Sequence, residues 1–136
     1  MSSSIVESIW NVYSELGSFH KENVYQTALY IDLNEKAMTV QTEIMVPIVY
    51  KNYTIGFCRA DIIIYENNKP NCILELKSQT TKIGNKEISQ LRKYLKYTNC
   101  EYGYVVNFYN ELEILKVSID CYEKISCDMF HQQNQP

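Results

Sequence analysis

Two runs of sequence decide the fold: Arg59-Ala60-Asp61-Ile62-Ile63-Ile64-Tyr65 and Asn71-Cys72-Ile73-Leu74-Glu75-Leu76-Lys77-Ser78. Both are rich in β-branched and other apolar residues, which predicts two β-strands. The polar segment between them contains a proline and predicts a turn, so the strands should form an antiparallel hairpin. Asp61, Glu75 and Lys77 interrupt these apolar runs. Burying such charges is costly unless they are paired or hold a metal.

The spacing of these three residues predicts that their side chains meet. Strand residues two apart point to the same face, so Glu75 and Lys77 project together while Leu74 and Leu76 face the other way. An antiparallel partner can bring Asp61 beside them. Two carboxylates and a lysine can hold Mg²⁺ and activate water for phosphodiester cleavage. The alternative is a simple salt bridge between Glu75 and Lys77 on a solvent-facing side of the sheet.

Further motifs extend this pattern into a family resemblance. Asp61 followed by Glu75-Leu76-Lys77 resembles the signature of the PD-(D/E)XK nuclease superfamily. One small branch, the GxxExxY proteins, resembles more of the chain. Its helix motif corresponds to Glu22-Asn23-Val24-Tyr25, and its Q-x-x-x-YL helix to Gln90-Leu91-Arg92-Lys93-Tyr94-Leu95. Its terminal strand corresponds to Asn107-Phe108.

The chain departs from the branch at one position. The glycine that the branch has three residues before Glu22 is Phe19 here, although Gly17 is present. Phe19 cannot take a positive φ cheaply. We therefore expect the start of the helix that carries Glu22 to differ from the family.

A Mg²⁺ (or Mn²⁺) ion would suit the oxygen donors of this site. Asp61 and Glu75 would be carboxylate ligands, and the backbone carbonyl of Leu76 could add a third oxygen. Glu22 could reach the same metal directly or through water, or hold a second one. The alternative for Glu22 is an ordinary acid at a helix start, favoured by the helix dipole.

The remaining candidate roles concern water and phosphate. Lys77 would orient or deprotonate the attacking water, or stabilise developing negative charge. Gln90 could position a water or a phosphate. Tyr25 could support Glu22 by a hydrogen bond. Glu22, Tyr25 and Leu29 share one helix face, which should look at the sheet.

The charge distribution bears on the substrate. The net charge is −3, with 13 basic and 16 acidic residues, which argues against a strongly DNA-binding protein. The segment from Lys77 to Lys96 nevertheless holds six basic residues and one acid. A solvated helix face is the alternative interpretation of this cluster. As a path for a phosphate backbone, it offers Lys82, Lys86, Arg92 and Lys93.

The predicted fold class is α/β, with a restriction-endonuclease-like core in which helices flank a central mixed sheet. The expected order is α-α-β-β-β-β-α-β-β, with helices near 4–15, 21–33 and 86–97. We expect Ser4 to cap the first helix and Gly17 to end it, Pro47 to break or bulge a strand, and a turn near Lys51-Asn52. The Glu75 strand, the helix near 86–97 and the strand that follows it should form a parallel, right-handed βαβ unit. A single domain should cover residues 1–130, with a frayed tail at 131–136.

These patterns predict a metal-dependent nuclease that acts on DNA, in repair, recombination or genome processing. A module of the same fold that binds nucleic acid or protein without cutting is the alternative. A homodimer or a protein partner remains open. No apolar run approaches the ~20 residues that cross a bilayer. The lack of a secretion signal and five scattered cysteines indicate an intracellular protein, cytoplasmic or nuclear.

Overall fold

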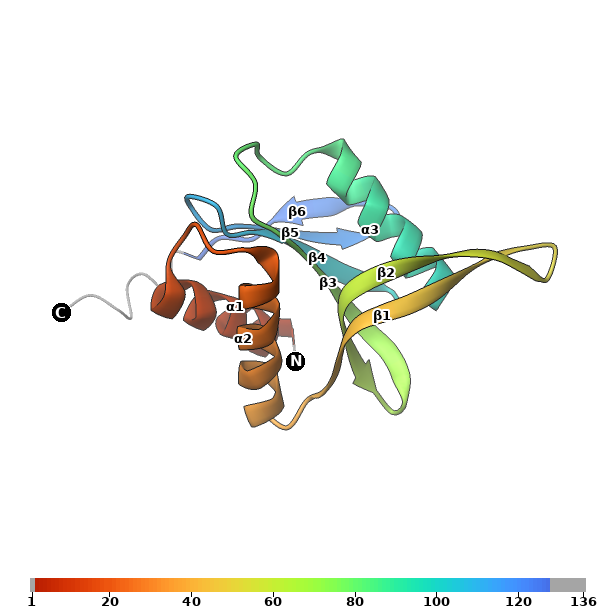
Figure 1. Cartoon of the computed structure of the whole chain (residues 1–136), viewed down its shortest axis with the longest axis horizontal. Coiled ribbons are helices and arrows are strands. Elements are labelled where there is room, and N and C mark those ends of the chain that lie inside the picture. Colours follow the sequence, from red (N-terminus) through yellow and green to blue (C-terminus); the bar gives the residue numbers. More distant parts are fainter. Residues whose placement is uncertain (1, 128–136) are drawn as a thin grey trace.

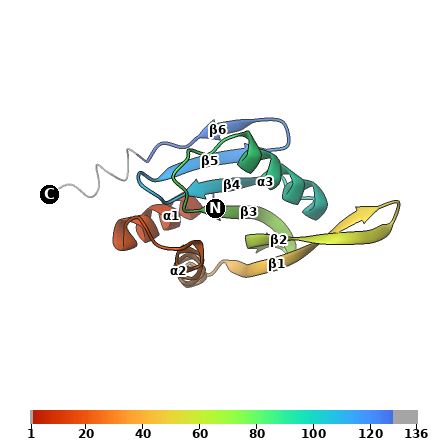
Figure 2. The ribbon, with the colours of Figure 1, turned by 45° about the horizontal axis from the view of Figure 1, so that its top comes forward.

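The computed structural model describes residues 2–127. A six-stranded sheet lies between two layers of helices, which confirms the expected α/β class (Figure 1). Helices α1 (Ser2–Leu16) and α2 (Glu22–Glu35) cover one face, and α3 (Asn85–Thr98) covers the other (Figure 2). None of these helices is long and apolar enough to span a bilayer. The expected tail at 131–136 and the end of the expected domain lie outside the described residues.

The sheet has the order β1-β2-β3-β4-β5-β6. Neighbouring strands are antiparallel except β3 and β4, which run parallel and are joined through α3. This crossover is the βαβ unit that the sequence predicts. The strands are β1 (Thr39–Tyr50), β2 (Tyr53–Glu66), β3 (Lys69–Lys77), β4 (Tyr102–Asn107), β5 (Glu113–Ser118) and β6 (Tyr122–Lys124).

The predicted element order is wrong in its strands. Three strands precede α3 and three follow it, giving α-α-β-β-β-α-β-β-β. Pro47 does not break the strand: it lies within β1 opposite Phe57, and the register of the hairpin shifts just beyond it, between Ile48 and Val49. Because β1 is an edge strand, the missing N–H of a proline can be tolerated there. The turn at Lys51-Asn52 is confirmed, so 39–66 forms one long hairpin.

The helix bounds differ slightly from those expected. The first helix begins at Ser2, so Ser4 lies inside it and does not cap it. Gly17 follows the helix with φ 70°, and its N–H donates to the Tyr13 carbonyl at 2.8 Å. This left-handed glycine ends the helix as predicted.

Two hydrophobic cores lie on the two faces of the sheet. The core under α1 and α2 includes the fully buried Tyr25, Leu29 and Phe108. The core under α3 includes Leu91 and Val105. Burial of β3 on both faces explains its continuous apolar sequence.

The strands of the β1–β2 hairpin exchange the faces of their side chains at Glu43. Strict alternation would place Ala60 and Ile62 on one face, but Ala60 packs under α3 and Ile62 under α1 and α2. Between them, Glu43 has φ 53°, and the pairing passes from Thr42↔Ile62 to Ile44↔Ala60. The left-handed residue thus lies opposite Asp61. Beyond this point residues 44–60 form a two-stranded ribbon that first packs under α3 and then projects from the body at its outer end (Figure 1).

The close contact of β3 and β4 predicts a sensitive glycine. A Cβ on Gly103 would clash with the Ile73 carbonyl and lie 3.2 Å from Leu91 Cδ1. Gly103→Ala should therefore lower the free energy of unfolding by ~2 kcal/mol or more, measured by urea denaturation. In Gly56→Ala, the control, the new Cβ would meet only Ile48 Cδ1 at 3.8 Å. The control should stay within about 0.5 kcal/mol of wild type. Equal losses of stability in both variants would contradict this account.

Candidate active site

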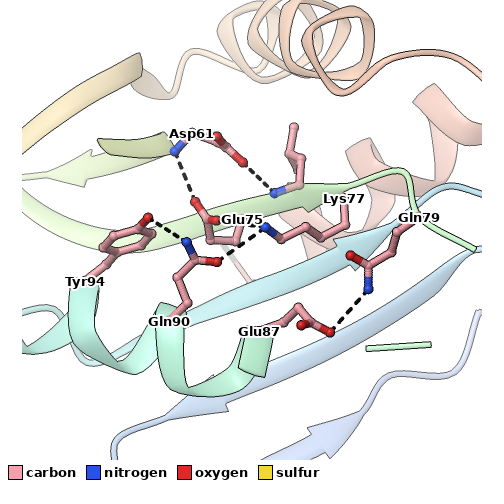
Figure 3. Close-up of polar contacts among 8 residues, drawn as sticks. Asp61, Glu75, Lys77, Gln79, Glu87, Gln90 and Tyr94 are labelled. Carbon is pink, nitrogen blue, oxygen red and sulfur yellow. Dashed lines mark hydrogen bonds and ion pairs between the residues drawn. The ribbon is translucent and has the colours of Figure 1, made fainter. Parts of the chain in front are cut away.

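The candidate site begins where β2 and β3 separate. Their paired residues run from the turn to Ile62↔Leu74 and stop there. The next contacts are made by side chains: the Leu76 N–H donates to Asp61 Oδ2 at 2.8 Å, and the Asp61 N–H donates to Glu75 Oε1 at 3.3 Å (Figure 3). Each carboxylate therefore accepts from a backbone N–H of the opposite strand, in place of a backbone carbonyl. This reciprocal pairing holds Asp61 and Glu75 at the fork.

The Leu76 carbonyl faces the same fork. The Lys77 carbonyl accepts from the Phe108 N–H at 3.0 Å, so Lys77 directs its backbone groups toward β4. Successive strand residues direct these groups to opposite sides, and the Leu76 N–H indeed points to Asp61. The Leu76 carbonyl thus lies on the Asp61 side. The three oxygen atoms that the sequence indicates as metal ligands therefore lie on the β2 side of β3.

Lys77 is held between β3 and α3. Its Nζ lies 3.9 Å from Glu75 Oε2 and donates to Gln90 Oε1 at 3.3 Å. Gln90 Nε2 in turn donates to the Tyr94 hydroxyl at 3.2 Å (Figure 3). The structure therefore brings Gln90 to the site through Lys77. The sequence patterns do not assign Tyr94 to the site, although its position four residues after Gln90 on a helix is a usable signal.

Glu22 lies beside the carboxylate pair and not within it. It is the first residue of α2 and is exposed, whereas Glu75 is only 4% exposed. Burial raises the pKa of Glu22, Lys77 lowers it and Asp61 raises it. Glu22 therefore lies close enough to Lys77 and Asp61 for their charges to affect its pKa. Among residues 2–127, no three His, Cys, Asp or Glu side chains gather as a metal cluster.

The expected bond from Tyr25 to Glu22 is replaced by contacts to the α1–α2 connection. The Tyr25 hydroxyl donates to the Gly17 carbonyl at 2.6 Å and accepts from the His20 N–H at 3.3 Å. Its ring stacks on Phe108, with centroids 4.0 Å apart. The ring points into the core, away from the exposed Glu22, because the apolar face of α2 packs on the sheet. Tyr25 supports the loop before Glu22.

The basic residues divide into two groups. Lys82, Lys86 and Lys93 are exposed. Burial raises the pKa of Cys58 on β2 and the charge of Lys93 acts against this shift, so Lys93 lies near this part of β2. Arg92 instead donates from Nε to the Ser118 carbonyl at 2.9 Å, which holds it over the end of β5, three strands from β2 in the sheet. Arg92 thus departs from the expected basic path, because adjacent helix positions point in different directions.

The carboxylate pair resists holding two negative charges. Burial, and then repulsion from Asp61, raise the pKa of Glu75 from 4.5 to about 8, although Lys77 and the Asp61 N–H act against this shift. Burial also raises the pKa of Asp61, opposed by the Leu76 N–H and by Lys77. A bound cation would relieve the same repulsion. The hard oxygen donors of Asp61, Glu75 and Leu76 fit Mg²⁺ or Mn²⁺.

The raised pKa of Glu75 predicts a pH-dependent stability of the metal-free protein. Between pH 4.5 and about 8 the folded state binds more protons than the unfolded state, so stability falls as pH rises through this window. Each pKa unit corresponds to about 1.4 kcal/mol. Glu75→Gln should therefore melt several degrees above wild type near pH 8, with a smaller difference near pH 5.

Scanning calorimetry in EDTA would measure this difference. Glu66→Gln, at the exposed end of β2, is the matched control and should follow wild type at both pH values. A Glu75→Gln variant that melts below wild type near pH 8 would contradict the electrostatic account.

Comparisons with known structures and sequences indicate the family of this chain. A crystal structure of SSO0001 resembles the chain with a TM-score of 0.54 and 21% sequence identity. The match covers 85% of this chain and 60% of that one, so the likeness concerns the fold. No curated protein matches the sequence. The sequence model of the PD-(D/E)XK nuclease superfamily matches residues 1–118. The chain therefore belongs to the PD-(D/E)XK nuclease superfamily.

Proposed function

We propose that this protein is a Mg²⁺-dependent nuclease that hydrolyses DNA phosphodiester bonds, in repair, recombination or genome processing. One observation carries the proposal: Asp61 and Glu75 hold each other's strands at the fork, with Lys77 Nζ 3.9 Å from Glu75 Oε2. A salt bridge on a solvent-facing sheet would not need a second, half-buried carboxylate beside it. Membership of the nuclease superfamily supports the reaction class.

Asp61, Glu75 and the Leu76 carbonyl would hold the metal ion, with Glu22 as a further ligand directly or through water. When bound, Mg²⁺ or Mn²⁺ supplies charge neutralisation at the phosphate and lowers the pKa of a water nucleophile. Glu22 lies outside the buried pair of carboxylates. It would therefore have to move toward the metal ion when the metal or the substrate binds. The carboxylates of Asp61 and Glu75 are already oriented by the hydrogen bonds that they accept from backbone N–H groups.

Lys77 would act on the attacking water, either by orienting it or by taking its proton. The same ammonium group can instead stabilise negative charge that develops on the phosphate. Gln90 accepts from Lys77 Nζ and fixes its direction, so Gln90 is a positioning residue in this scheme. Tyr94 accepts from the Gln90 amide and thereby sets which end of that amide faces Lys77.

DNA would reach the site along the exposed lysines Lys82, Lys86 and Lys93. Lys93 lies near Cys58 of the ribbon of residues 44–60, which packs under α3. This local positive charge would oppose the overall charge of −3. We also assign the chain to the GxxExxY branch, in an intracellular setting that suits five cysteines outside any disulfide. A second copy of the chain is an option for cutting both strands of a duplex.

The nuclease proposal predicts loss of cleavage in Lys77→Ala. Removing a group that positions or deprotonates water should lower the rate by about 10²-fold or more. Cleavage of linear, nicked and single-stranded DNA would be followed during a Mg²⁺ or Mn²⁺ titration, and EDTA should abolish it. Lys69→Ala, at the other end of β3, is the control and should cleave as wild type does.

Wild-type rates in Lys77→Ala would refute the assignment of this site. Metal binding that depends on Asp61 and Glu75 but produces no cleavage would favour a non-cleaving module. The overall negative charge is the observation that keeps this second function in view.

The proposed DNA path predicts a change in salt dependence. Lys86→Glu combined with Lys93→Glu should weaken DNA binding and reduce the steepness of its salt dependence by about 0.9 for each phosphate that is no longer neutralised. Fluorescence anisotropy at several salt concentrations, with Ca²⁺ in place of Mg²⁺, would measure both quantities. Lys69→Glu, at the opposite end of β3 from Lys77, is the control. An unchanged slope would mean that DNA lies elsewhere.

A further inference from the structure

The loop between α1 and α2 presents an aromatic ring in an unusual backbone conformation. Phe19 has φ 73°, and its side chain is 71% exposed. A bulky residue with positive φ is strained, and an exposed ring gains little from packing in return. The GxxExxY pattern has a glycine here, which would adopt this conformation without strain. The chain thus keeps a glycine conformation but carries a phenylalanine.

Contacts on both sides of Phe19 hold this loop in place. Ser18 Oγ donates to the Asn110 carbonyl at 2.7 Å, and Ser78 Oγ donates to the His20 carbonyl at 2.8 Å. His20 also bonds through its ring to the Leu16 carbonyl at 3.0 Å. Together with the Tyr25 contacts, these bonds fix the backbone around Phe19. The ring is therefore displayed by an ordered loop.

The ring borders an open hollow of about 660 Å³ next to the candidate active site. Tyr109 stands against Phe19, with ring centroids 5.2 Å apart and planes at 90°. Glu22 and Ser78 line the hollow as well. Glu22 is also a candidate ligand of the proposed metal ion, so it belongs to both the hollow and the candidate site. The hollow therefore adjoins the candidate site through Glu22, on the side of the sheet where Ser78 contacts His20.

We propose that this hollow binds an unpaired nucleobase, which stacks on the face of Phe19, next to the phosphate at the Asp61–Glu75 site. Stacking on an aromatic side chain recognises any unpaired base, because every base has a π-face. Lys21, on the rim, offers a cation to the adjoining phosphate. The T-shaped contact with Tyr109 leaves at least one face of the Phe19 ring for the base.

This inference rests on the proposed nuclease function and narrows its substrate. DNA with an unpaired nucleotide beside a duplex, as in a fork or a flap, would fill the hollow. A blunt duplex keeps its bases stacked inside the helix and would not. The protein should therefore prefer forked DNA over blunt duplex of the same length.

Phe19→Gly separates recognition from folding. Glycine relieves the positive φ and removes the ring, so stability and base recognition should move in opposite directions. The melting temperature should be equal to or above that of wild type. Affinity for forked DNA should fall about tenfold, the effect expected for loss of one stacked base. Phe19→Trp should retain the preference, because it keeps an aromatic face.

Fluorescence of 2-aminopurine placed at the unpaired position reports the stacking directly. Wild type and Phe19→Trp should quench it in Ca²⁺, and Phe19→Gly should not. Tyr122→Ala removes another exposed aromatic, 55% exposed on β6, and is the matched control. It should bind and quench as wild type does.

The proposal is overturned if Phe19→Gly keeps the wild-type ratio of affinities for forked and blunt DNA. It is also overturned if Phe19→Gly melts below wild type, because the ring would then serve the fold. If the wild-type protein cleaves DNA and the Phe19 variants cleave it equally well with the same substrate preference, only this inference is refuted. If the wild-type protein neither binds nor cleaves any DNA, the nuclease function is refuted, and this inference with it.

Discussion

The site depends on the exchange of hydrogen bonds between the Asp61 and Glu75 carboxylates and the opposite strands. Where two strands separate, backbone N–H groups lose their partners and must find others. The two carboxylates take that place, so the same contacts close the end of the hairpin and orient the acids. The carboxylates are held in place because they accept from backbone N–H groups that lose their strand partners at the fork.

The fork coincides with the position where the two faces of the β1–β2 hairpin exchange, at Glu43. A non-glycine residue in the left-handed region costs of order 1–3 kcal/mol, and the hairpin retains one opposite Asp61. At this position the hairpin passes from one core to the other, and β2 stops pairing with β3. The left-handed residue and the two acids therefore lie at the same place along the hairpin.

The arrangement that suits a metal ion also lowers the stability of the metal-free protein. Burial and mutual repulsion raise the pKa of Glu75 to about 8, so the metal-free site is unfavourable for two negative charges. Lys77 and the backbone donors offset part of this repulsion. Lys77 is in turn held by Gln90 from α3, and the loop before Glu22 is held by Tyr25 from α2. Both helical layers therefore meet at one end of the sheet.

Local patterns determined much of this protein in advance. Apolar strand sequence with three charges, a polar turn and helical spacing predicted the hairpin, the βαβ unit and the meeting of Asp61, Glu75 and Lys77. Those features depend on neighbours in sequence and on strand alternation, which are readable without coordinates. Phe19 in place of glycine was visible as well, although the sequence alone could not show that the backbone keeps the glycine conformation.

Tertiary packing decided the rest. Pro47 lies within a strand because that strand is at an edge, which only the strand order reveals. Tyr25 turns from Glu22 because its ring stacks on Phe108, a residue far away in sequence. Arg92 leaves the expected basic path because the end of β5 offers it a carbonyl. The sequence by itself determined which groups could do the chemistry, and the tertiary structure decided which of them meet, since direction and burial depend on distant partners.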